Sequence, residues 1–348
     1  MSEQRLAGEP QKGLGLGRRV RYLVDRVRAL DAGRLWNLAG AISKDARRPR
    51  LVILVDMLYS SVVYEIAFQD YQDWDFFDLT RAERRTFMSH PKSNHLALKL
   101  NHPDFRGKLA DKSRFNEEFA EFLGREWLDV RNTDAQQIEE FVTRHGAVMA
   151  KVPDSLGGIG IAKREASEIT DYAAFREELL AGRQFLLEQL IPQHEEMSRL
   201  CNTSVNTLRV ISYLDGDKVH ILASVLKIGN GGAIDNFSHG GMYTMLDDHG
   251  VAHYAAFDGE NRTFTVHPVT GTSIVGFQVP LFGEVLSFVD KIARVVPQVP
   301  YVGWDIAISP NGPVVIEGNY NTGVFQAKPS VSGVRTGLLP RYREAIGF

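Results

Sequence analysis

Residues 302–319 read VGWDIAISPNGPVVIEGN, which is the pattern of two apolar strands joined by the turn PNG at 310–312. A two-residue Asn-Gly loop would place Asp305 and Glu317 on opposite faces of this hairpin, whereas a three-residue loop would pair them directly. Proline at the second position of a type I turn, followed by glycine at positive φ, favours the three-residue loop. We therefore expect Asp305, Glu317 and Asn319 to share one face.

These three side chains are candidate metal ligands. Mg²⁺ prefers hard oxygen ligands and keeps coordination positions for phosphate oxygens. Two carboxylates directly opposite each other would destabilise a hairpin that lacked a cation between them. A solvated polar face is the alternative explanation for the same pattern.

A second group of residues suits a polyphosphate. Lys151 ends a short apolar strand, and the loop DSLGGIG at 154–160 follows it. A lysine neutralises phosphate oxygens, while glycines let backbone N–H groups approach them closely. A strand follows the loop, so the spacing matches neither the P-loop nor the dinucleotide fingerprint. A plain β-turn connection is the alternative. The candidate loop residues are Ser155, Gly157, Gly158 and Gly160.

A third segment, Glu188 to Pro192, is an apolar strand end followed by Glu195. Backbone groups at such an end can bind an adenine edge, and the later carboxylate can accept hydrogen bonds from ribose hydroxyls. Acidic residues after strands are common, so this signal is weak by itself.

Composition sets the general class of the protein. The 348 residues are 44% hydrophobic and 24% charged, which excludes a disordered, collagen-like or disulfide-based chain and suggests two domains or one with sub-lobes. The net charge of −3 gives no overall field that would attract nucleic acid. A single cysteine, Cys201, fits a reducing cytosol and is expected to be a small buried residue. We expect a cytoplasmic protein without a signal peptide or membrane span.

The N-terminal 50 residues are the basic part of the chain, with 12 Lys and Arg against 5 Asp and Glu. We expect residues 1–17 to be a flexible tail and Arg18–Leu30 to be a solvated basic helix, with contact to a membrane or an acidic partner as the alternative. The most apolar run, Leu51–Phe68, is interpreted as core, as are the aromatic residues of 68–77.

The order of expected elements is helices first, then mainly antiparallel strands with helices between them, which is an α+β order. Residues 18–88 are mostly helical in pattern. Further helices are expected at 112–123, 134–145, 171–180 and 282–295, and strands at 147–152, 161–164, 185–191, 208–214, 219–226, 302–308 and 314–318.

Together these residues resemble the ATP-grasp superfamily over about residues 105–330. The order Lys112, Lys151 with its loop, Glu188, then Asp305, Glu317 and Asn319 is similar throughout. The closing hairpin, with His267-Pro268 and Thr270-Gly271 upstream, resembles the sugar-transfer-associated branch. The resemblance implies two α+β lobes that clamp ATP after a helical N-terminal region. The expected divisions are 1–17, 18–104, 105–190 for the small lobe and 191–348 for the large lobe.

The resemblance also implies roles for individual residues. Lys112 and Lys151 would contact the α- and β-phosphates, and Asp305, Glu317 and Asn319 would hold two Mg²⁺ ions. Adenine would be bound by Glu188 and Gln189 with backbone groups of Leu190 and Ile191, and ribose by Glu195 or Glu196. Many members carry an arginine where this chain has Gly303, so Arg209 is the candidate for that task. Lys227 would reach the γ-phosphate, and His239, in a polar loop, would act as a base or bind substrate.

The function implied is that of an ADP-forming carbon–nitrogen ligase, which activates a carboxylate as an acyl phosphate for attack by an amine. The alternatives are an ATP-grasp kinase that phosphorylates a sugar-like hydroxyl, and a nucleotide-binding module without catalysis. The expected partners are small-molecule carboxylates and amines, with a homodimer left open.

Overall fold

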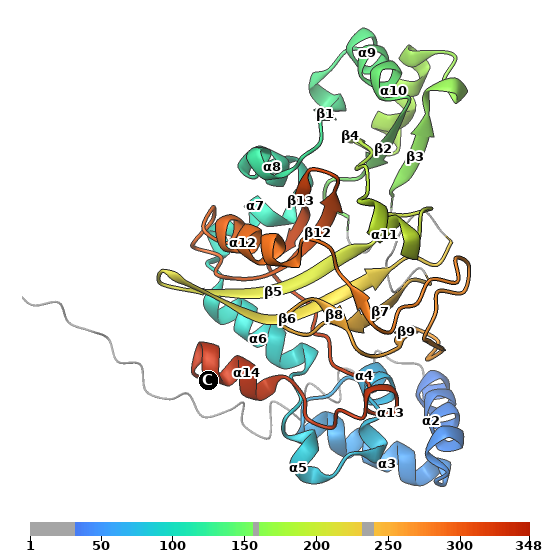
Figure 1. Ribbon diagram of the computed structural model, residues 1–348, viewed down its shortest axis with the longest axis vertical. Helices are drawn as coiled ribbons and strands as arrows, with labels where there is room; N and C mark the ends of the chain where they lie inside the picture. The colour runs from blue at the N-terminus through green and yellow to red at the C-terminus, as the bar shows by residue number, and fades with distance from the viewer. Residues whose placement is uncertain (1–31, 156–159, 232–239) are drawn as a thin grey trace, which may run out of the picture. The chain divides into compact units, whose positions relative to one another are not determined.

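The computed structural model describes residues 32–155, 160–231 and 240–348 (Figure 1). The chain divides into two compact units, one of Met1–Ser93 with Lys328–Phe348 and one of Asn94–Ala327. The C-terminal segment therefore groups with the N-terminal helices. The expected division, in which residues 191–348 form one large lobe, did not include this grouping. Several predictions fall outside the described residues: the tail at 1–17, the basic helix Arg18–Leu30, Gly157, Gly158 and His239.

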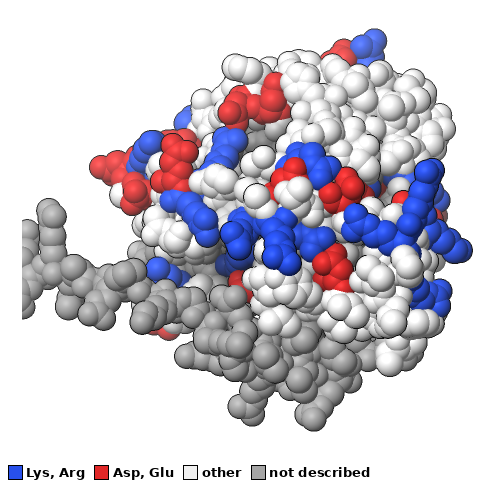
Figure 2. Space-filling model, turned by 90° about the horizontal axis from the view of Figure 1, so that it is seen from below, with Lys and Arg blue, Asp and Glu red and all other residues white. Residues whose placement is uncertain are grey.

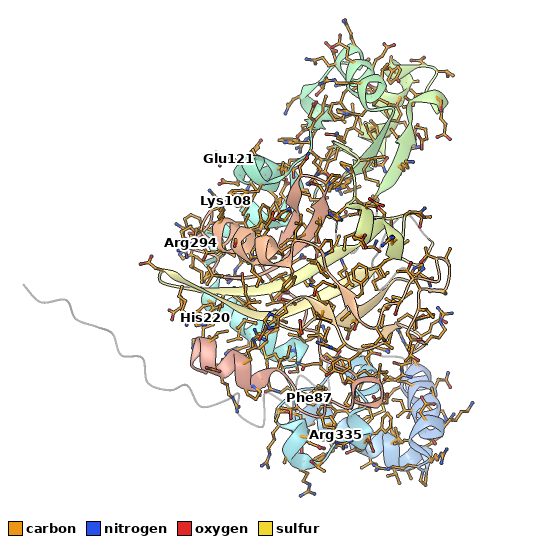
Figure 3. All side chains as sticks on the ribbon, in the orientation of Figure 1. Phe87, Lys108, Glu121, His220, Arg294 and Arg335 are labelled. Carbon is orange, nitrogen blue, oxygen red and sulfur yellow. The ribbon has the colours of Figure 1, made fainter. Side chains whose placement is uncertain are left out.

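The first unit is helical, as the sequence predicts. Its core contains the aromatic side chains of Tyr71, Trp74 and Phe76, all at most 2% exposed. The C-terminal segment is attached to it by Arg335, labelled in Figure 3, whose Nε donates to Glu83 Oε1 at 2.7 Å. The helices are α2 (Ala32–Ala46), α3 (Arg50–Val63), α4 (Phe68–Asp73), α5 (Arg81–Arg84), α13 (Pro329–Ser332) and α14 (Leu339–Ile346), with α6 (His90–Leu100) beginning in this unit.

The expectation that Leu51–Phe68 is core is wrong for one face of α3. Ile53 and Met57 are fully buried, but Leu51, Val52 and Val55 are 63%, 51% and 59% exposed. The run therefore forms a helix with one apolar face packed inside and a second apolar face outside.

A four-stranded antiparallel sheet of order β1-β4-β2-β3 forms the small lobe of the second unit. Its helices α9 (Ala135–His145) and α10 (Tyr172–Ala181) begin where the sequence predicts, because Asp134 and Asp171 accept hydrogen bonds from backbone N–H groups of the first turn. Buried side chains of both helices pack with β2 and β4. The strands are β1 (Trp127–Asp129), β2 (Ala147–Lys151), β3 (Ala162–Glu165) and β4 (Leu186–Gln189).

A seven-stranded antiparallel sheet of order β10-β9-β7-β6-β5-β12-β13 forms the larger part of the unit. The strands expected at 208–214 and 219–226 are present as β5 and β6, and they form a hairpin in which Asp215 pairs with Lys218 across a two-residue turn. Helix α12 lies beside β12 and β13 in Figure 1 and contributes to the same core. The strands are β5 (Thr207–Asp215), β6 (Lys218–Ile228), β7 (Met242–Met245), β9 (Ala256–Asp258), β10 (Thr263–Phe264), β12 (Tyr301–Ser309) and β13 (Gly312–Asn319).

The remaining elements connect these sheets. Two short strands, β8 (Val251–Ala252) and β11 (Phe277–Gln278), pair with each other. The helices are α7 (Gly107–Ala110), α8 (Lys112–Glu118), α11 (Glu195–Leu200) and α12 (Phe282–Ile292), and single 3₁₀ turns lie at Phe76–Asp78, Pro103–Phe105, Ala120–Phe122, Val130–Asn132 and Ala166–Glu168. Within the described residues, no helix has the length and apolar content that crossing a membrane requires.

The final hairpin has the predicted pairing but a different loop. Asp305 pairs with Glu317, as expected, and Gly312 has a positive φ of 117°. The loop itself is one residue shorter than predicted, because Ser309 pairs with Gly312. The extra residue is in a β-bulge instead, where the register shifts between Asp305 and Ile306 and passes over Ile316.

Two glycines at positive φ differ in whether neighbouring atoms leave room for a side chain. A Cβ on Gly124 would collide with the Val314 side chain, whereas a Cβ on Gly333 would meet nothing within 4 Å. We expect Gly124→Ala to destabilise the protein by about 1–3 kcal/mol more than Gly333→Ala, because both residues have positive φ, 57° and 70°, and only the first site is overpacked. Urea unfolding of both variants measures the difference, and equal midpoints would contradict it.

Candidate functional site

The two carboxylates of the final hairpin meet as the sequence predicts. Asp305 on β12 and Glu317 on β13 are paired residues whose carboxyl groups hydrogen-bond each other. The Asn319 amide lies beside them, with Nδ2 donating to Glu317 Oε1 at 3.2 Å and to the Gly303 carbonyl at 3.3 Å. The hairpin therefore gathers three oxygen-bearing side chains.

Two cations from neighbouring strands flank Asp305. Arg209 on β5 is its cross-strand partner and donates from Nε and Nη2 to the two carboxylate oxygens, at 2.5 and 2.8 Å. Lys227 Nζ on β6 lies 3.6 Å from Asp305 Oδ2. Although burial opposes it, these two charges hold the pKa of Asp305 far below its ordinary value.

Glu317 has the opposite electrostatic environment. Burial, followed by the nearby Asp305 charge, raises the pKa of Glu317 above its ordinary value, against the attraction of Arg209 and Lys112. The pair thus consists of one carboxylate that is firmly ionised and one that resists ionisation. An additional cation at this point would favour the ionised form of both.

Gly303 explains how Arg209 reaches this position. A side chain at residue 303 would collide with Thr322 Oγ1, and its Cβ would lie 3.2 Å from Arg209 Cδ. The space in front of Gly303 is therefore filled by Thr322 and, next to it, by the arginine of the adjacent strand. Phe325 lies below that arginine, with its ring centroid 5.8 Å from the guanidinium carbon.

Lys151 and Glu188 form a buried ion pair on adjacent strands of the small lobe. Lys151 Nζ lies 2.5 Å from Glu188 Oε2, and Asn116 Nδ2 donates to the other oxygen at 3.0 Å. Glu188 is only 2% exposed, so its side chain serves this ion pair and is not open to an adenine base. The prediction of a base-binding carboxylate at Glu188 is not favoured by this arrangement.

Arg125 completes this ion pair and is the main residue that sequence reasoning missed. Its Nε and Nη2 donate to the two oxygens of Glu188 at 2.8 and 3.2 Å, while Nη1 and Nη2 donate to the carbonyls of Val315 and Ile316 at 2.8 and 3.4 Å. Although burial opposes it, the charges of Arg125 and Lys151 hold the pKa of Glu188 well below its ordinary value. No motif surrounds Arg125, and Asn116 and Phe325 likewise carried no signal.

Lys112 lies at the base of the glycine-rich loop. Its Nζ donates to the Ser155 carbonyl at 2.5 Å and to the Pro153 carbonyl at 3.3 Å. Burial lowers the pKa of Lys112, with the Glu317 charge opposing this shift and the Lys151 charge adding to it. Lys112 is therefore close enough to interact electrostatically with residues of both sheets.

The remaining predicted nucleotide residues lie along the exit from β4. The Gln189 side chain accepts a hydrogen bond from the Glu126 N–H at 3.1 Å, which holds it to the sheet edge. Leu190 and Ile191 are half-buried, while Glu195 is exposed in the first turn of α11. Its neighbour Glu196 pairs with Arg199 at 3.0 Å, which makes Glu195 the better candidate for a ribose.

Two side chains with possible chemistry have structural roles instead. His267 is 1% exposed, with Nε2 on the Gly229 carbonyl at 2.8 Å and Nδ1 accepting from Thr270 N at 3.2 Å. Cys201 is 2% exposed and lies in the core of the large sheet, as the sequence predicts.

The donor set fits Mg²⁺. All three candidate ligand atoms are hard oxygens, and a bound cation would stabilise the ionised form of both carboxylates. Only the oxygen of the Asn319 amide can ligate a metal, and its nitrogen is engaged with Glu317. Among the described residues there is no cluster of three or more His, Cys, Asp or Glu side chains, so the third ligand would have to be this amide.

Lys151 on one antiparallel sheet and the Asp305–Glu317 hairpin on a second give the two lobes of an ATP-grasp fold. Residues 176–335 match the family model described as sugar-transfer associated ATP-grasp. The matched region contains Glu188, Arg209, Lys227, Asp305, Glu317 and Asn319. The resemblance that the sequence suggests is thereby confirmed.

Comparison with solved structures finds ATP-grasp enzymes at low identity. D-alanyl-alanine synthetase A from Vibrio cholerae O1 biovar eltor str. N16961 is 12% identical with TM-score 0.41, and the match covers 71% of this chain and 63% of that one. The ATP-grasp ligase PsnB complexed with minimal precursor is 16% identical with TM-score 0.44, covering 81% and 77%. D-alanine–D-alanine ligase from Bacillus anthracis is 13% identical with TM-score 0.38, covering 74% and 70%. The sequence has no match among curated proteins.

The Arg125–Glu188 ion pair generates a stability prediction. Arg125→Met should destabilise the protein by about 3–5 kcal/mol, because it leaves a buried carboxylate with only part of its compensation. Arg144→Met is the matched control, since Arg144 and its partner Glu126 are 58% and 54% exposed, and it should cost less than about 1 kcal/mol. Guanidinium unfolding measures both, and a similar loss in the two variants would contradict the assignment.

Proposed function

We propose that this protein is an ATP-dependent carboxylate–amine ligase. The observation that carries the proposal is the Asp305–Glu317 pair, with Asn319 beside it and with Arg209 and Lys227 on the adjoining strands. Paired acids bounded by fixed cations suit a reaction that transfers a phosphoryl group and then stabilises an acyl phosphate. The match of residues 176–335 to the sugar-transfer associated ATP-grasp family supports the same class of chemistry.

The proposed reaction has two steps. A substrate carboxylate oxygen attacks the γ-phosphorus of ATP, so a P–O bond forms while the bond to ADP breaks. An amine nitrogen then attacks the acyl carbon and displaces phosphate, and the amine loses a proton as the amide forms. Exclusion of water by the surrounding lobes would protect the acyl phosphate from hydrolysis.

In this scheme, the charge of each side chain determines which part of the reaction it serves. Lys151 and Lys112 would neutralise phosphate oxygens beneath the loop that includes Ser155 and Gly160. Arg209 would face the transferring group while it stays bonded to Asp305, with Lys227 directed at the γ-phosphate. Mg²⁺, held by Asp305, Glu317 and Asn319, would supply charge neutralisation of the phosphates.

The remaining assignments are also part of the proposal. Gln189 and the backbone of Leu190 and Ile191 would contact adenine, and Glu195 would contact ribose. Glu188 is a positioning residue for Lys151 in this scheme. His239 is proposed as a base or substrate contact, and small carboxylates and amines as the substrates.

Product analysis tests the reaction class. The chain is incubated with ATP, Mg²⁺ and pools of carboxylates and amines, and the products are identified by mass spectrometry. An amide with ADP and phosphate supports the ligase. A phosphoester with ADP would instead identify a kinase that phosphorylates a hydroxyl group. The family description, sugar-transfer associated ATP-grasp, is compatible with this alternative. Nucleotide binding with no turnover would identify a non-catalytic module.

Glu317→Gln separates the chemical role of the acid pair from its structural role. It should reduce ADP formation on the order of a thousandfold, because the site loses a charged metal ligand. Without metal, the variant should be no less stable than the parent near neutral pH, because a carboxyl group that resists ionisation beside Asp305 is replaced by a neutral amide. Glu121→Gln, at an exposed site, should change neither quantity. Near-normal ADP formation by Glu317→Gln would exclude the metal assignment.

Lys151→Ala tests the phosphate site. Loss of a charge-assisted contact should weaken ATP affinity about ten- to a hundredfold in titration calorimetry. Lys163→Ala is the matched control, because Lys163 lies on β3, next to the strand of Lys151, and also pairs with a glutamate, Glu165, but its side chain is 47% exposed. If the two variants bind ATP equally well, Lys151 does not contact phosphate.

A further inference from the structure

Helix α3 of the first unit presents an apolar face to solvent. The residues of α3 that are exposed are all apolar: Leu51, Val52, Val55, Tyr59 and Val63, between 41% and 63% exposed. At 100° per residue they lie within an arc of about 120°. A surface helix normally places polar residues on such an arc, so this helix reverses the usual pattern.

The polar side chain nearest this face, Asp56, is directed away from solvent. Its two carboxylate oxygens accept from Arg84 Nη1 and Nη2, both at 2.7 Å, and Tyr71 donates to it at 2.5 Å. The charge at the margin of the face is therefore neutralised within the unit.

Basic residues precede the apolar face along the chain. Residues 32–50 contain five basic side chains and one acidic one, Asp45: the basic ones are Arg34, Lys44, Arg47, Arg48 and Arg50. Arg50 lies with its guanidinium carbon 4.8 Å from the ring centroid of Trp36, which is itself 44% exposed. Figure 2 shows a band of Lys and Arg side chains on one face of the molecule, with some Asp and Glu side chains among them and areas without charged side chains beside it.

We propose that the exposed face of α3, with Trp36, docks onto an anionic membrane surface. Aliphatic side chains with Trp and Tyr, beside arginines and lysines, are the composition of a helix that lies in the lipid headgroup region. The five exposed residues contribute one hydrogen-bonding side-chain group, the Tyr59 hydroxyl. With so few polar groups, such a face cannot fix the orientation of a protein partner through hydrogen bonds. Binding to a lipid surface requires no such specific contacts. The basic residues complement anionic headgroups.

The binding experiment uses the full chain in flotation with vesicles of phosphatidylcholine, alone or mixed with phosphatidylglycerol. The protein should float with the mixed vesicles, and more weakly with the neutral ones, because the basic residues contribute only where the surface is anionic. Added salt should weaken the binding, since it screens those charges.

Val55→Glu is the variant that tests the face. It should lower partitioning about tenfold or more, because a charge replaces an apolar group that enters the headgroup region. Leu98→Glu is the matched control, since Leu98 on α6 is also 59% exposed, and it should bind like the parent. Both variants should keep the parent's thermal midpoint and ATP affinity, because both positions are at the surface and neither belongs to the candidate ATP site.

Three results would overturn the proposal. The first is failure of the parent protein to bind the mixed vesicles. The second is an equal loss in Val55→Glu and Leu98→Glu. The third is sedimentation velocity in which the parent is a dimer and Val55→Glu a monomer, which would make this face a contact between two copies of the chain.

Discussion

The buried guanidinium of Arg125 links the two sheets on which the candidate site depends. Placing a charge at 8% residue exposure is costly unless its donors are satisfied, and Arg125 is bonded to Glu188 and to carbonyls of Leu123, Val315 and Ile316. The Ile316 carbonyl belongs to the bulge that sets the register of Glu317. Glu188, in turn, holds Lys151. One side chain therefore fixes both Lys151, through Glu188, and the carboxylate opposite Asp305, so the relative geometry of these groups is a property of the core and not of surface loops.

The Asp305–Glu317 pair, unlike Arg125, includes a charge that the protein does not fully compensate. Arg209 and Lys227 compensate Asp305 fully, whereas Glu317 is buried beside a like charge and resists ionisation. A structure optimised only for stability would favour a neutral residue at this position, because burial and the Asp305 charge both oppose ionisation of Glu317. Under the proposed function, Glu317 is retained because it would help to hold Mg²⁺. The same reasoning does not apply to Glu188, which the protein compensates with its own residues.

Features that depend on local sequence could be predicted, and those that depend on distant partners could not. The N-caps Asp134 and Asp171, the β5–β6 turn and the positive φ of Gly312 follow from adjacent residues. The pairing of Asp305 with Glu317 was predicted correctly but from the wrong loop length. The bulge at Ile316 compensates for the shorter loop, and the group that binds the bulge, Arg125, lies about 190 residues away in the sequence. The burial of Glu188 was missed for the same reason, since its partners Arg125 and Asn116 belong to other elements.

Hydrophobicity alone also failed to distinguish core from exposed surface in α3. The number of apolar residues in Leu51–Phe68 does not indicate which face of the helix is buried. Burial of Ile53 and Met57 is enough to attach the helix to the first unit. The remaining apolar arc then has no role in folding, and its exposure to water has a free-energy cost that a polar face would avoid. The residues of this arc belong to the first unit, and all described residues of the candidate ATP site belong to the second. If both proposals hold, surface attachment and nucleotide chemistry belong to different compact units of the chain, and a substitution in one unit can be used to test each property by itself.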